Sequence, residues 1–299
     1  MSRLLLVFNL FLAFIWGYRS VITAATKSLI HLALDEDIGY GDCTTEFLID
    51  RELTAEALVL VKQPSRIVGL SLIEAVFATL DPSVTVTRLV TEGADISAAT
   101  AVCKLSGSAR SILTGERTAL NFLGRLSGIA TLTRDAVAQL AGTNAKLLDT
   151  RKTTPGWRTL EKYAVRMGGG FNHRFGLFDM VLIKDNHIAL SDGIAAAVRK
   201  TQTLAGPARK IEVEVETLEQ LREAAAAQVD MILLDNMDIS TMRQAVLIIN
   251  GQIPLEASGN MTLERLPEVA SSGVDFISMG ALTHSAVSRD VGLDISFTN

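Results

Sequence analysis

The chain has 299 residues, of which 48% are hydrophobic and 20% are charged. This length and composition suit one large globular domain or two modest ones with a sizeable core. The formal net charge of −5 argues against a broad nucleic-acid-binding surface, which usually shows as a basic excess. The two cysteines, Cys43 and Cys103, lie far apart without the spacing of a metal site, and they fit a protein of a reducing compartment.

The first 20 residues differ in character from the rest. Residues 4–16 read LLLVFNLFLAFIW, an almost wholly apolar run that follows Arg3. The run resembles the apolar part of a signal peptide, and it is shorter than the roughly 20 residues that a membrane-spanning helix needs. Because nothing downstream looks secreted, we interpret residues 1–28 as an atypical extension or the result of a misplaced start codon. We expect a cytoplasmic protein without a membrane segment.

Residues 29–128 predict a separate α+β layer. Stretches 55–70 and 83–93 contain strand-like runs punctuated by turn residues, and 115–140 has the composition of one long helix. No low-complexity linker follows, so this part is expected to pack tightly against the remainder of the chain.

A different sequence pattern begins near Ala130, where short apolar runs alternate with helical stretches such as 217–228 and 239–250. Alternation of this kind predicts parallel βαβ units. The runs that read as strands are 146–149, 180–184, 210–216, 230–235, 253–257 and 274–280.

The residues at the ends of these runs favour a closed barrel over an open sheet. The first four runs end in a charged residue, at Asp149, Lys184, Glu216 and Asp235. The remaining two runs, 253–257 and 274–280, lead into glycine turns. A barrel gathers functional groups at the C-terminal ends of many strands around one mouth, whereas an open sheet concentrates them at its switch point.

One basic stretch stands out in this acidic protein. Residues 148–176 hold seven basic side chains against two acids, Asp149 and Glu161; the seven are Arg151, Lys152, Arg158, Lys162, Arg166, His173 and Arg174. Arg151 and Lys152 follow a predicted strand, so we expect them at the barrel mouth with Arg174 and Lys184. Guanidinium and ammonium groups suit carboxylate or phosphate ligands.

Two further expectations concern the same stretch. Arg158, Lys162 and Arg166 are spaced four apart, which predicts a solvated helix face. The three glycines at 168–170 are expected to allow the backbone to approach a ligand closely.

Carboxylates form a second candidate constellation. In the run 210–216, Glu212, Glu214 and Glu216 share one face, and the two valines between them share the other. Valines belong under the outer helices, so the glutamates are expected to point into the barrel, where they need cations or a metal. With Asp235, they could hold Mg²⁺ completed by substrate phosphates. Internal ion pairing with Lys184 or Lys210 is the alternative.

The turns 257–260 and 278–281 each place a glycine after a late strand, a position where such barrels often bind phosphate. No arrangement of serine, cysteine or histidine suggests a covalent nucleophile, and the sequence contains neither a GxxxxGK[ST] loop nor a dinucleotide-binding fingerprint. The cations therefore predict one anionic ligand, and the carboxylates and turns a second, phosphate-bearing one.

Seven segments, in order along residues 29–295, closely resemble the quinolinate phosphoribosyltransferase family, also called nicotinate-nucleotide pyrophosphorylase (carboxylating). They are ALDEDIGYGDCTT, GERTALNFLGRLSGIAT, the stretch from LDTRKTTPGW to LIKDNHI, IEVEVETLEQ, ILLDNM, LEASGN and GVDFISMGALTHS. The resemblance implies transfer of phosphoribosyl from phosphoribosyl pyrophosphate (PRPP) to quinolinate, with release of pyrophosphate and CO₂, to give nicotinate mononucleotide for NAD synthesis.

The resemblance also implies a fold. It predicts an N-terminal α/β sandwich domain, residues 29–128, and an incomplete, seven-stranded α/β barrel of the type II phosphoribosyltransferase kind, residues 129–281. Residues 282–299 are expected to pack on the first domain. A homodimer, or a larger assembly of dimers, with shared active sites is implied as well.

Site residues follow from the same motif match. Quinolinate is expected to meet Thr150, Arg151, Lys152, His173, Arg174 and Lys184, with Arg117 entering from the partner subunit. Glu214 and Asp235 are expected to hold Mg²⁺ with PRPP and, with Lys152, to be the catalytic residues. The turns Ser258-Gly259-Asn260 and Met279-Gly280-Ala281 are expected to cradle the 5′-phosphate.

Three alternatives stay open at this level. A paralogous family found beside molybdate transporters shares the barrel but departs from the intact LIKDNH motif with Lys184. Nicotinate phosphoribosyltransferase acts on a monocarboxylate and needs fewer cations. A catalytically inactive binding protein on the same fold is the third, since fold alone does not fix function.

Overall fold

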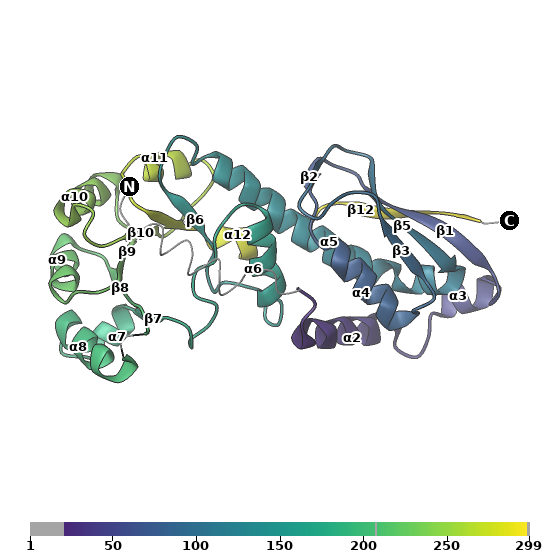
Figure 1. Cartoon of the computed structure of the whole chain (residues 1–299), viewed down its shortest axis with the longest axis horizontal. Coiled ribbons are helices and arrows are strands. Elements are labelled where there is room, and N and C mark those ends of the chain that lie inside the picture. Colours follow the sequence, from purple (N-terminus) through teal and green to yellow (C-terminus); the bar gives the residue numbers. More distant parts are fainter. Residues whose placement is uncertain (1–20, 207, 298–299) are drawn as a thin grey trace.

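The computed structural model describes residues 21–206 and 208–297 (Figure 1). The apolar run 4–16 lies outside the described residues. Val21 is buried and helix α2 (Ala24–Ile38) starts shortly after it, so the boundary expected between residues 28 and 29 falls inside this helix. Thr23 caps α2, because its side-chain oxygen accepts the backbone N–H of Thr26 at 3.2 Å.

The N-terminal domain is built on an antiparallel sheet with strand order β12-β1-β5-β3. Helices α4 and α5 pack on each other and cover one face of this sheet (Figure 1). The elements are α2, α3 (Cys43–Leu48), β1 (Thr54–Val61), β2 (Ser65–Arg66), α4 (Leu70–Leu80), β3 (Thr85–Arg88), β4 (Asp95–Ile96), β5 (Thr100–Ser108), α5 (Ala109–Ala138) and β12 (Val291–Phe297).

Strand β1 shows why this sheet forms. Ala55, Ala57, Val59 and Val61 are buried, and the residues between them are more exposed, so the strand turns one apolar face to the helices. Strand β12 pairs along the whole of β1 from Ala55 to Val61. The C-terminal end of the chain therefore completes the N-terminal sheet.

Helix α5 is 30 residues long, and the expected domain boundary at 128/129 falls within it. Its contacts reach α4 and strands of the first sheet on one side, and α6 and β6 on the other. A single continuous helix thus connects the two halves of the molecule (Figure 1).

The second half is a parallel sheet with strand order β6-β11-β10-β9-β8-β7, surrounded by helices. The position of a seventh strand is held by a single bridge, in which Phe171 pairs in parallel with Leu148. The elements are β6 (Lys146–Leu148), α6 (Arg158–Met167), β7 (Val181–Ile183), α7 (Asp185–Ala189), α8 (Ile194–Ala205), β8 (Ile211–Val215), α9 (Leu218–Ala226), β9 (Met231–Asp235), α10 (Ile239–Ile249), β10 (Leu255–Ser258), α11 (Leu266–Ala270), β11 (Phe276–Ser278) and α12 (Ala281–His284).

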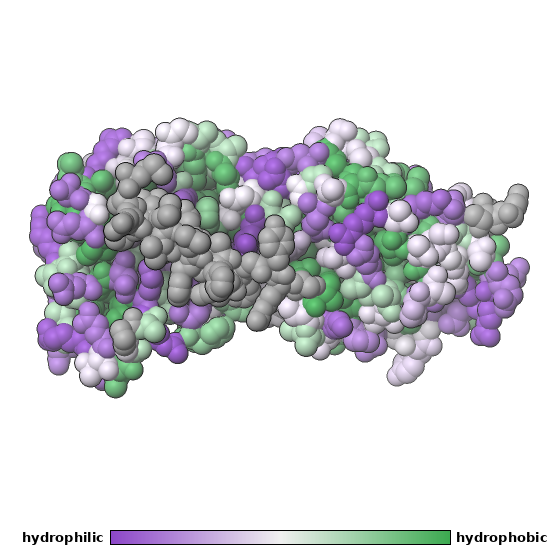
Figure 2. Space-filling model, in the orientation of Figure 1, coloured by the Kyte–Doolittle hydropathy of each residue, from purple (hydrophilic) through white to green (hydrophobic). Residues whose placement is uncertain are grey.

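Each predicted strand run of the barrel overlaps an observed strand, and local signals explain where the helices begin. Thr217 and Gln220 form a capping box at the start of α9, and Asp238 accepts the N–H of Thr241 at 2.8 Å at the start of α10. Helix α10 ends at Asn250 in the left-handed conformation. Hydrophilic side chains cover much of the outside of α8–α10 in Figure 2.

Across residues 21–206 and 208–297, no helix combines the length and apolar character that crossing a bilayer requires.

Candidate active site

Carboxylates from neighbouring strands point into the barrel. Val213 and Val215 are fully buried, and the glutamates between and beside them occupy the opposite face of β8. Glu214 pairs in register with Leu233 of β9, so Asp235, two residues further along, faces the same way and lies nearer the mouth. The inward orientation predicted for Glu212 and Glu214 is thus observed, whereas Glu216 is exposed at the end of the strand.

Both candidate metal ligands already have polar partners. Lys184 at the end of β7 donates from Nζ to Oε2 of Glu214, whose side chain is 11% exposed. The Nδ2 atom of Asn236 donates to Oδ2 of Asp235 at 2.7 Å. Each carboxylate contacts its partner through one oxygen, so the inner wall of the mouth presents acids held in place by a cation and an amide.

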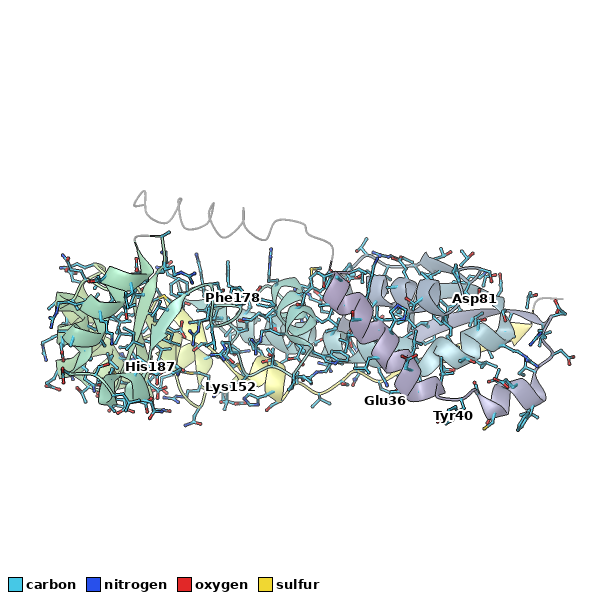
Figure 3. The ribbon with its side chains drawn as sticks, turned by 90° about the horizontal axis from the view of Figure 1, so that it is seen from below. Glu36, Tyr40, Asp81, Lys152, Phe178 and His187 are labelled. Carbon is cyan, nitrogen blue, oxygen red and sulfur yellow. The ribbon has the colours of Figure 1, made fainter. Side chains whose placement is uncertain are left out.

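The loop after β6 carries exposed cations. Arg151 and Lys152 are exposed, and the N–H of Lys152 is bound by the Thr150 hydroxyl at 3.0 Å. The side chain of Lys152 lies against the turn 279–281, since a Cβ added at Gly280 would be 2.9 Å from Lys152 Cδ. The Lys152 carbonyl also accepts a hydrogen bond from Thr283 at 2.8 Å. Lys152 and His187 lie on the same side of the molecule in Figure 3.

Arg174 extends this positive region into the barrel. Its Nη1 donates to the carbonyl of Met180 at 3.3 Å. Burial, and after it the nearby charge of Arg151, lowers the pKa of Arg174. His187 lies apart from them: it is exposed, and its Nδ1 accepts the N–H of Lys184 at 2.9 Å.

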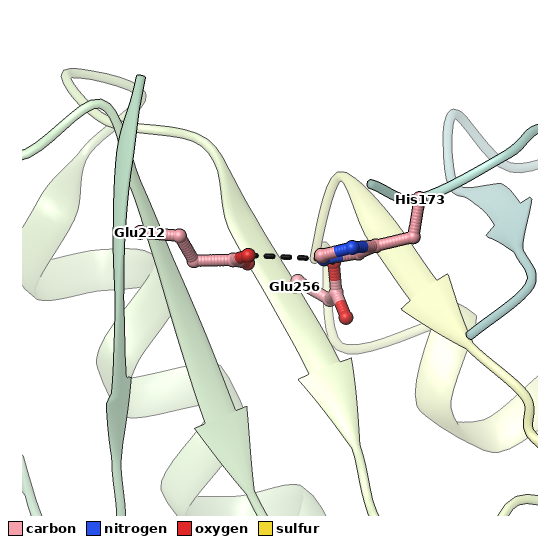
Figure 4. A group of neighbouring side chains, drawn as sticks. All are labelled: His173, Glu212 and Glu256. Carbon is pink, nitrogen blue, oxygen red and sulfur yellow. Dashed lines mark hydrogen bonds and ion pairs between the residues drawn. The ribbon is translucent and has the colours of Figure 1, made fainter. Parts of the chain in front are cut away.

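The side chain of His173, which is predicted to help line the anion site, is more buried than those of Arg151 and Lys152. Its side chain is 8% exposed, and Nε2 faces Glu212 Oε2 at 2.9 Å and Glu256 Oε2 at 3.4 Å (Figure 4). Burial alone would lower the pKa of His173, but the two carboxylates outweigh it and raise the pKa to about 10. Burial, with Glu256 next, raises the pKa of Glu212 to about 7.

These three residues have the composition of a metal site, but the tautomer argues against one. In the neutral ring, the Nδ1 atom of His173 accepts the backbone N–H of Arg174 at 2.7 Å, so the nitrogen that faces the acids carries the proton; in the charged ring both nitrogens carry one. A protonated nitrogen has no lone pair for a metal. The cluster is therefore a buried imidazole held by two acids directly below Arg174.

The prediction that Arg158 and Lys162 lie on a solvated face of α6 is wrong. The Lys162 side chain is 3% exposed and forms a buried ion pair with Asp149, while Arg158 is half-buried and binds backbone and side-chain groups of the neighbouring loops. Burial raises the pKa of Asp149 and lowers that of Lys162, and each partner opposes the shift in the other. Of the predicted face, only Arg166 is exposed.

Two of the three glycines that follow α6, Gly168 and Gly170, allow α6 to pack closely against α5. A Cβ added at Gly168 would lie 2.5 Å from Thr133 Cβ and 2.7 Å from the Ala130 carbonyl oxygen, both in α5. Gly170 meets Thr133 as well. The run therefore brings α6 close to α5, and its predicted approach to a ligand stays a prediction.

The turn 258–260 packs on the end of β9. Gly259 has φ +101°, and Asn260 Nδ2 is 3.3 Å from Oδ1 of Asn236. Arg265 fixes the turn from below by donating to the Gly259 carbonyl at 2.9 Å. Asn236 and Glu256 were missed as site residues. Period-two alternation could have found Glu256, because it shares its face with Ser258.

Arg117 lies on α5 with its side chain 61% exposed, 3.8 Å from Glu116. It lines a cavity of about 450 Å³ between α5 and the chain leading into β12, together with Asn121, Trp157 and Arg289. The described chain thus leaves this guanidinium accessible from outside.

Comparison with known proteins decides the family. The description "Quinolinate phosphoribosyl transferase, C-terminal domain" matches residues 129–294, and the N-terminal domain of the same family matches residues 42–127. The chain belongs to the quinolinate phosphoribosyl transferase family. The molybdate-associated alternative is not favoured by these matches.

Individual relatives agree with this assignment. A probable nicotinate-nucleotide pyrophosphorylase [carboxylating] of Bacillus subtilis is 45% identical over 273 residues, which cover 91% of this chain and 94% of that protein. A protein of the same description from Synechocystis is 46% identical over 266 residues, 88% of each. The crystal structure of NadC from Streptococcus pyogenes superposes with a TM-score of 0.91 at 38% identity and covers 94% of this chain and 100% of that one.

Proposed function

We propose that the protein is a decarboxylating quinolinate phosphoribosyltransferase. It joins the ring nitrogen of quinolinate to C1′ of PRPP and releases pyrophosphate and CO₂, giving nicotinate mononucleotide for NAD synthesis. The observation that carries the proposal is the position of Lys152. It belongs to the cation loop with Arg151, yet it lies against the turn at Gly280, so a dianion subsite and a phosphate subsite adjoin.

The positive region suits a dicarboxylate. Thr150, Arg151 and Lys152 follow β6, Lys184 follows β7, and Arg174 lies between them in the chain, three residues after the bridge residue Phe171. Quinolinate carries two adjacent carboxylates, and charge-assisted contacts from two guanidinium groups match such a dianion. A monocarboxylate such as nicotinate would leave part of this charge uncompensated, and that favours the dicarboxylate.

The acids and turns suit PRPP and a divalent ion. Glu214 and Asp235 supply two carboxylates, and Mg²⁺ is usually bound by one or two carboxylates with substrate phosphates completing its shell. Each acid engages its protein partner through one oxygen, so the donor set fits the ion. When bound, Mg²⁺ would neutralise charge on the departing pyrophosphate. The turns at Gly259 and Gly280 are proposed to hold the 5′-phosphate.

The chemistry asks mainly for charge and position. As the bond from C1′ to pyrophosphate breaks, positive charge develops on the ribose, and the inward acids stabilise it while Lys152 faces the leaving group. The ring nitrogen then becomes quaternary and draws electrons from the C2–carboxylate bond as CO₂ leaves, after which C2 takes up a proton. Holding quinolinate in a dry site serves this step better than a general base.

We also propose that the protein is a homodimer and that it is cytoplasmic. Tyr40 after α2, Phe47 and Leu48 in α3, and Leu177 and Phe178 after Arg174 are all exposed, and we propose that these large apolar side chains contribute to the association surface. The accessible guanidinium of Arg117 would enter the partner's site across a two-fold interface. Cys43 and Cys103 are free thiols, as suits a reducing compartment.

One assay tests the function. Quinolinate labelled in its 2-carboxylate should release labelled CO₂ only when both PRPP and Mg²⁺ are present, and nicotinate should not replace it as a phosphoribosyl acceptor. Consumption of nicotinate in preference to quinolinate would identify a different phosphoribosyltransferase. Absence of any PRPP consumption would favour an inactive binding protein.

A further inference from the structure

Helix α6 buries two adjacent residues of opposite charge. The side chains of Glu161 and Lys162 are 0% and 3% exposed. Charges buried in this way are costly unless they are fully paired, and apolar residues of similar volume often stabilise a fold equally well. The partners of these two residues therefore indicate what the charges do.

Glu161 binds the loop that carries the first cations. Its Oε2 accepts the backbone N–H of Thr154 at 3.1 Å, and its Oε1 accepts the Thr154 hydroxyl at 2.8 Å. Arg125 of α5 pairs with the same carboxylate at 2.8 Å and also donates to the carbonyls of Ala286 and Thr283. Thr154 lies two residues after Lys152, so this carboxylate anchors the loop to α5 and to the segment that follows the turn at Gly280.

Lys162 binds the segment that carries the next cation. Its ammonium pairs with Asp149 and donates to the His173 carbonyl at 3.1 Å. Asp149 in turn accepts the N–H of His173 at 2.9 Å and the Asn172 side-chain amide at 2.6 Å. Four polar contacts thus fix the backbone immediately before Arg174.

Arg158, one turn earlier on α6, bridges the two segments. Its Nε donates to the Thr153 hydroxyl at 3.0 Å, and its Nη1 donates to the Phe175 carbonyl at 3.2 Å. Thr153 directly follows Lys152, and Phe175 directly follows Arg174. Arg158, Glu161 and Lys162 of α6 therefore bind both the segment after Lys152 and the segment around Arg174.

We infer that Arg158, Glu161 and Lys162 are positioning residues that set the separation between the Arg151–Lys152 loop and Arg174 to match the two carboxylates of quinolinate. The inference rests on the proposed function. Thr153 and Phe175, which Arg158 bridges, directly follow Lys152 and Arg174, so loss of the clamp would leave the separation of the two cationic segments less constrained. Misplacement of a binding group by about 1 Å can cost up to about 100-fold in rate, so a rigid clamp has a clear use.

The test compares Lys162→Met and Arg158→Gln with Lys200→Met. Lys200 is an exposed lysine on α8, and its substitution makes the same chemical change as Lys162→Met away from the clamp. KM for quinolinate should rise about ten- to hundredfold in the two clamp variants, while KM for PRPP stays within about twofold of wild type. Lys200→Met should match wild type in both constants.

Three results would overturn the inference: unchanged constants, an equal rise in both KM values, or a fall in kcat and melting temperature with both KM values retained. The last would mean that α6 only supports stability. If Lys162→Met does not fold, Arg158→Gln decides alone, because it leaves no buried charge unpaired. If the wild-type protein shows no PRPP-dependent consumption of quinolinate, the proposed function fails. Calorimetric binding of quinolinate to wild type and Arg158→Gln then still tests the clamp.

Discussion

Replacing Gly259 with alanine should damage the PRPP side of the site and leave the quinolinate side intact. Gly259 has φ +101°, a conformation that side chains with a Cβ adopt at a cost of about 1–2 kcal/mol. The added methyl group would also meet Asn236, at 2.6 Å from its Cγ and 3.0 Å from its Cα. Asn236 must then move, and with it the amide that binds Asp235 at 2.7 Å.

The magnitude follows from these two terms. Overpacking against a fixed neighbour costs about 1–3 kcal/mol, so with the backbone term the variant should lose about 2–5 kcal/mol of unfolding free energy. Gly251→Ala is the matched control, because Gly251 has φ +72° and nothing within 4 Å of its added Cβ. The control should lose only the backbone term of about 1–2 kcal/mol.

Thermal unfolding and steady-state kinetics measure both effects. At about 2–4 °C per kcal/mol for a chain of this order of size, Gly259→Ala should melt about 2–12 °C below Gly251→Ala. Its KM for PRPP should rise about tenfold with KM for quinolinate unchanged. Equal melting temperatures for the two variants, with a normal KM for PRPP, would refute the packing role assigned to Asn236 and the phosphate role proposed for the turn.

Four other predictions concern the remaining parts of the site. Arg151→Ala should lose about 1.5–3 kcal/mol of quinolinate binding, measured by calorimetry on the folded variant, and unchanged affinity would exclude it from the subsite. Glu214→Gln and Asp235→Asn should each raise the Mg²⁺ concentration needed for half-maximal activity without altering quinolinate affinity; an unaltered Mg²⁺ dependence and rate in both variants would remove the metal role. Arg117→Ala and Arg151→Ala should each be nearly inactive alone. When the two variants are mixed and native mass spectrometry confirms subunit exchange, up to roughly a quarter of all active sites should be intact, and activity should recover accordingly. Exchange without recovery would place Arg117 in its own chain's site or only in the fold. The folded pKa of His173 is raised from 6.5 to about 10, so the stability it contributes is present below pH 6.5 and is lost as pH rises toward 10; urea unfolding of His173→Gln should show a flatter pH dependence over this range, and a slope equal to that of wild type would contradict the raised pKa.

The sequence alone determined the elements of the fold and the chemical character of the site. The period-two alternation of β8 placed Glu212 and Glu214 inward, because side chains of a strand must take alternate faces and the valines had to meet the helices. Strand-end positions likewise predicted the carboxylates and cations of the mouth, since parallel strands bring their C-terminal ends to one edge. The motifs of the family identified the chemistry that these residues serve.

Only the tertiary structure decided which charges are buried and what they hold. The spacing of Arg158, Lys162 and Arg166 is the same on a solvated face and on a buried one; the approach of α6 to α5 through Gly168, and the position of Asp149 opposite Lys162, turned two of the three inward. In the same way, the sequence around His173 and Arg174 does not show that the first side chain contacts Glu212 and Glu256 and that the second binds the carbonyl of Met180. Contacts with residues that are distant in the sequence fix these orientations, and the positions of those residues in space cannot be deduced from local sequence patterns.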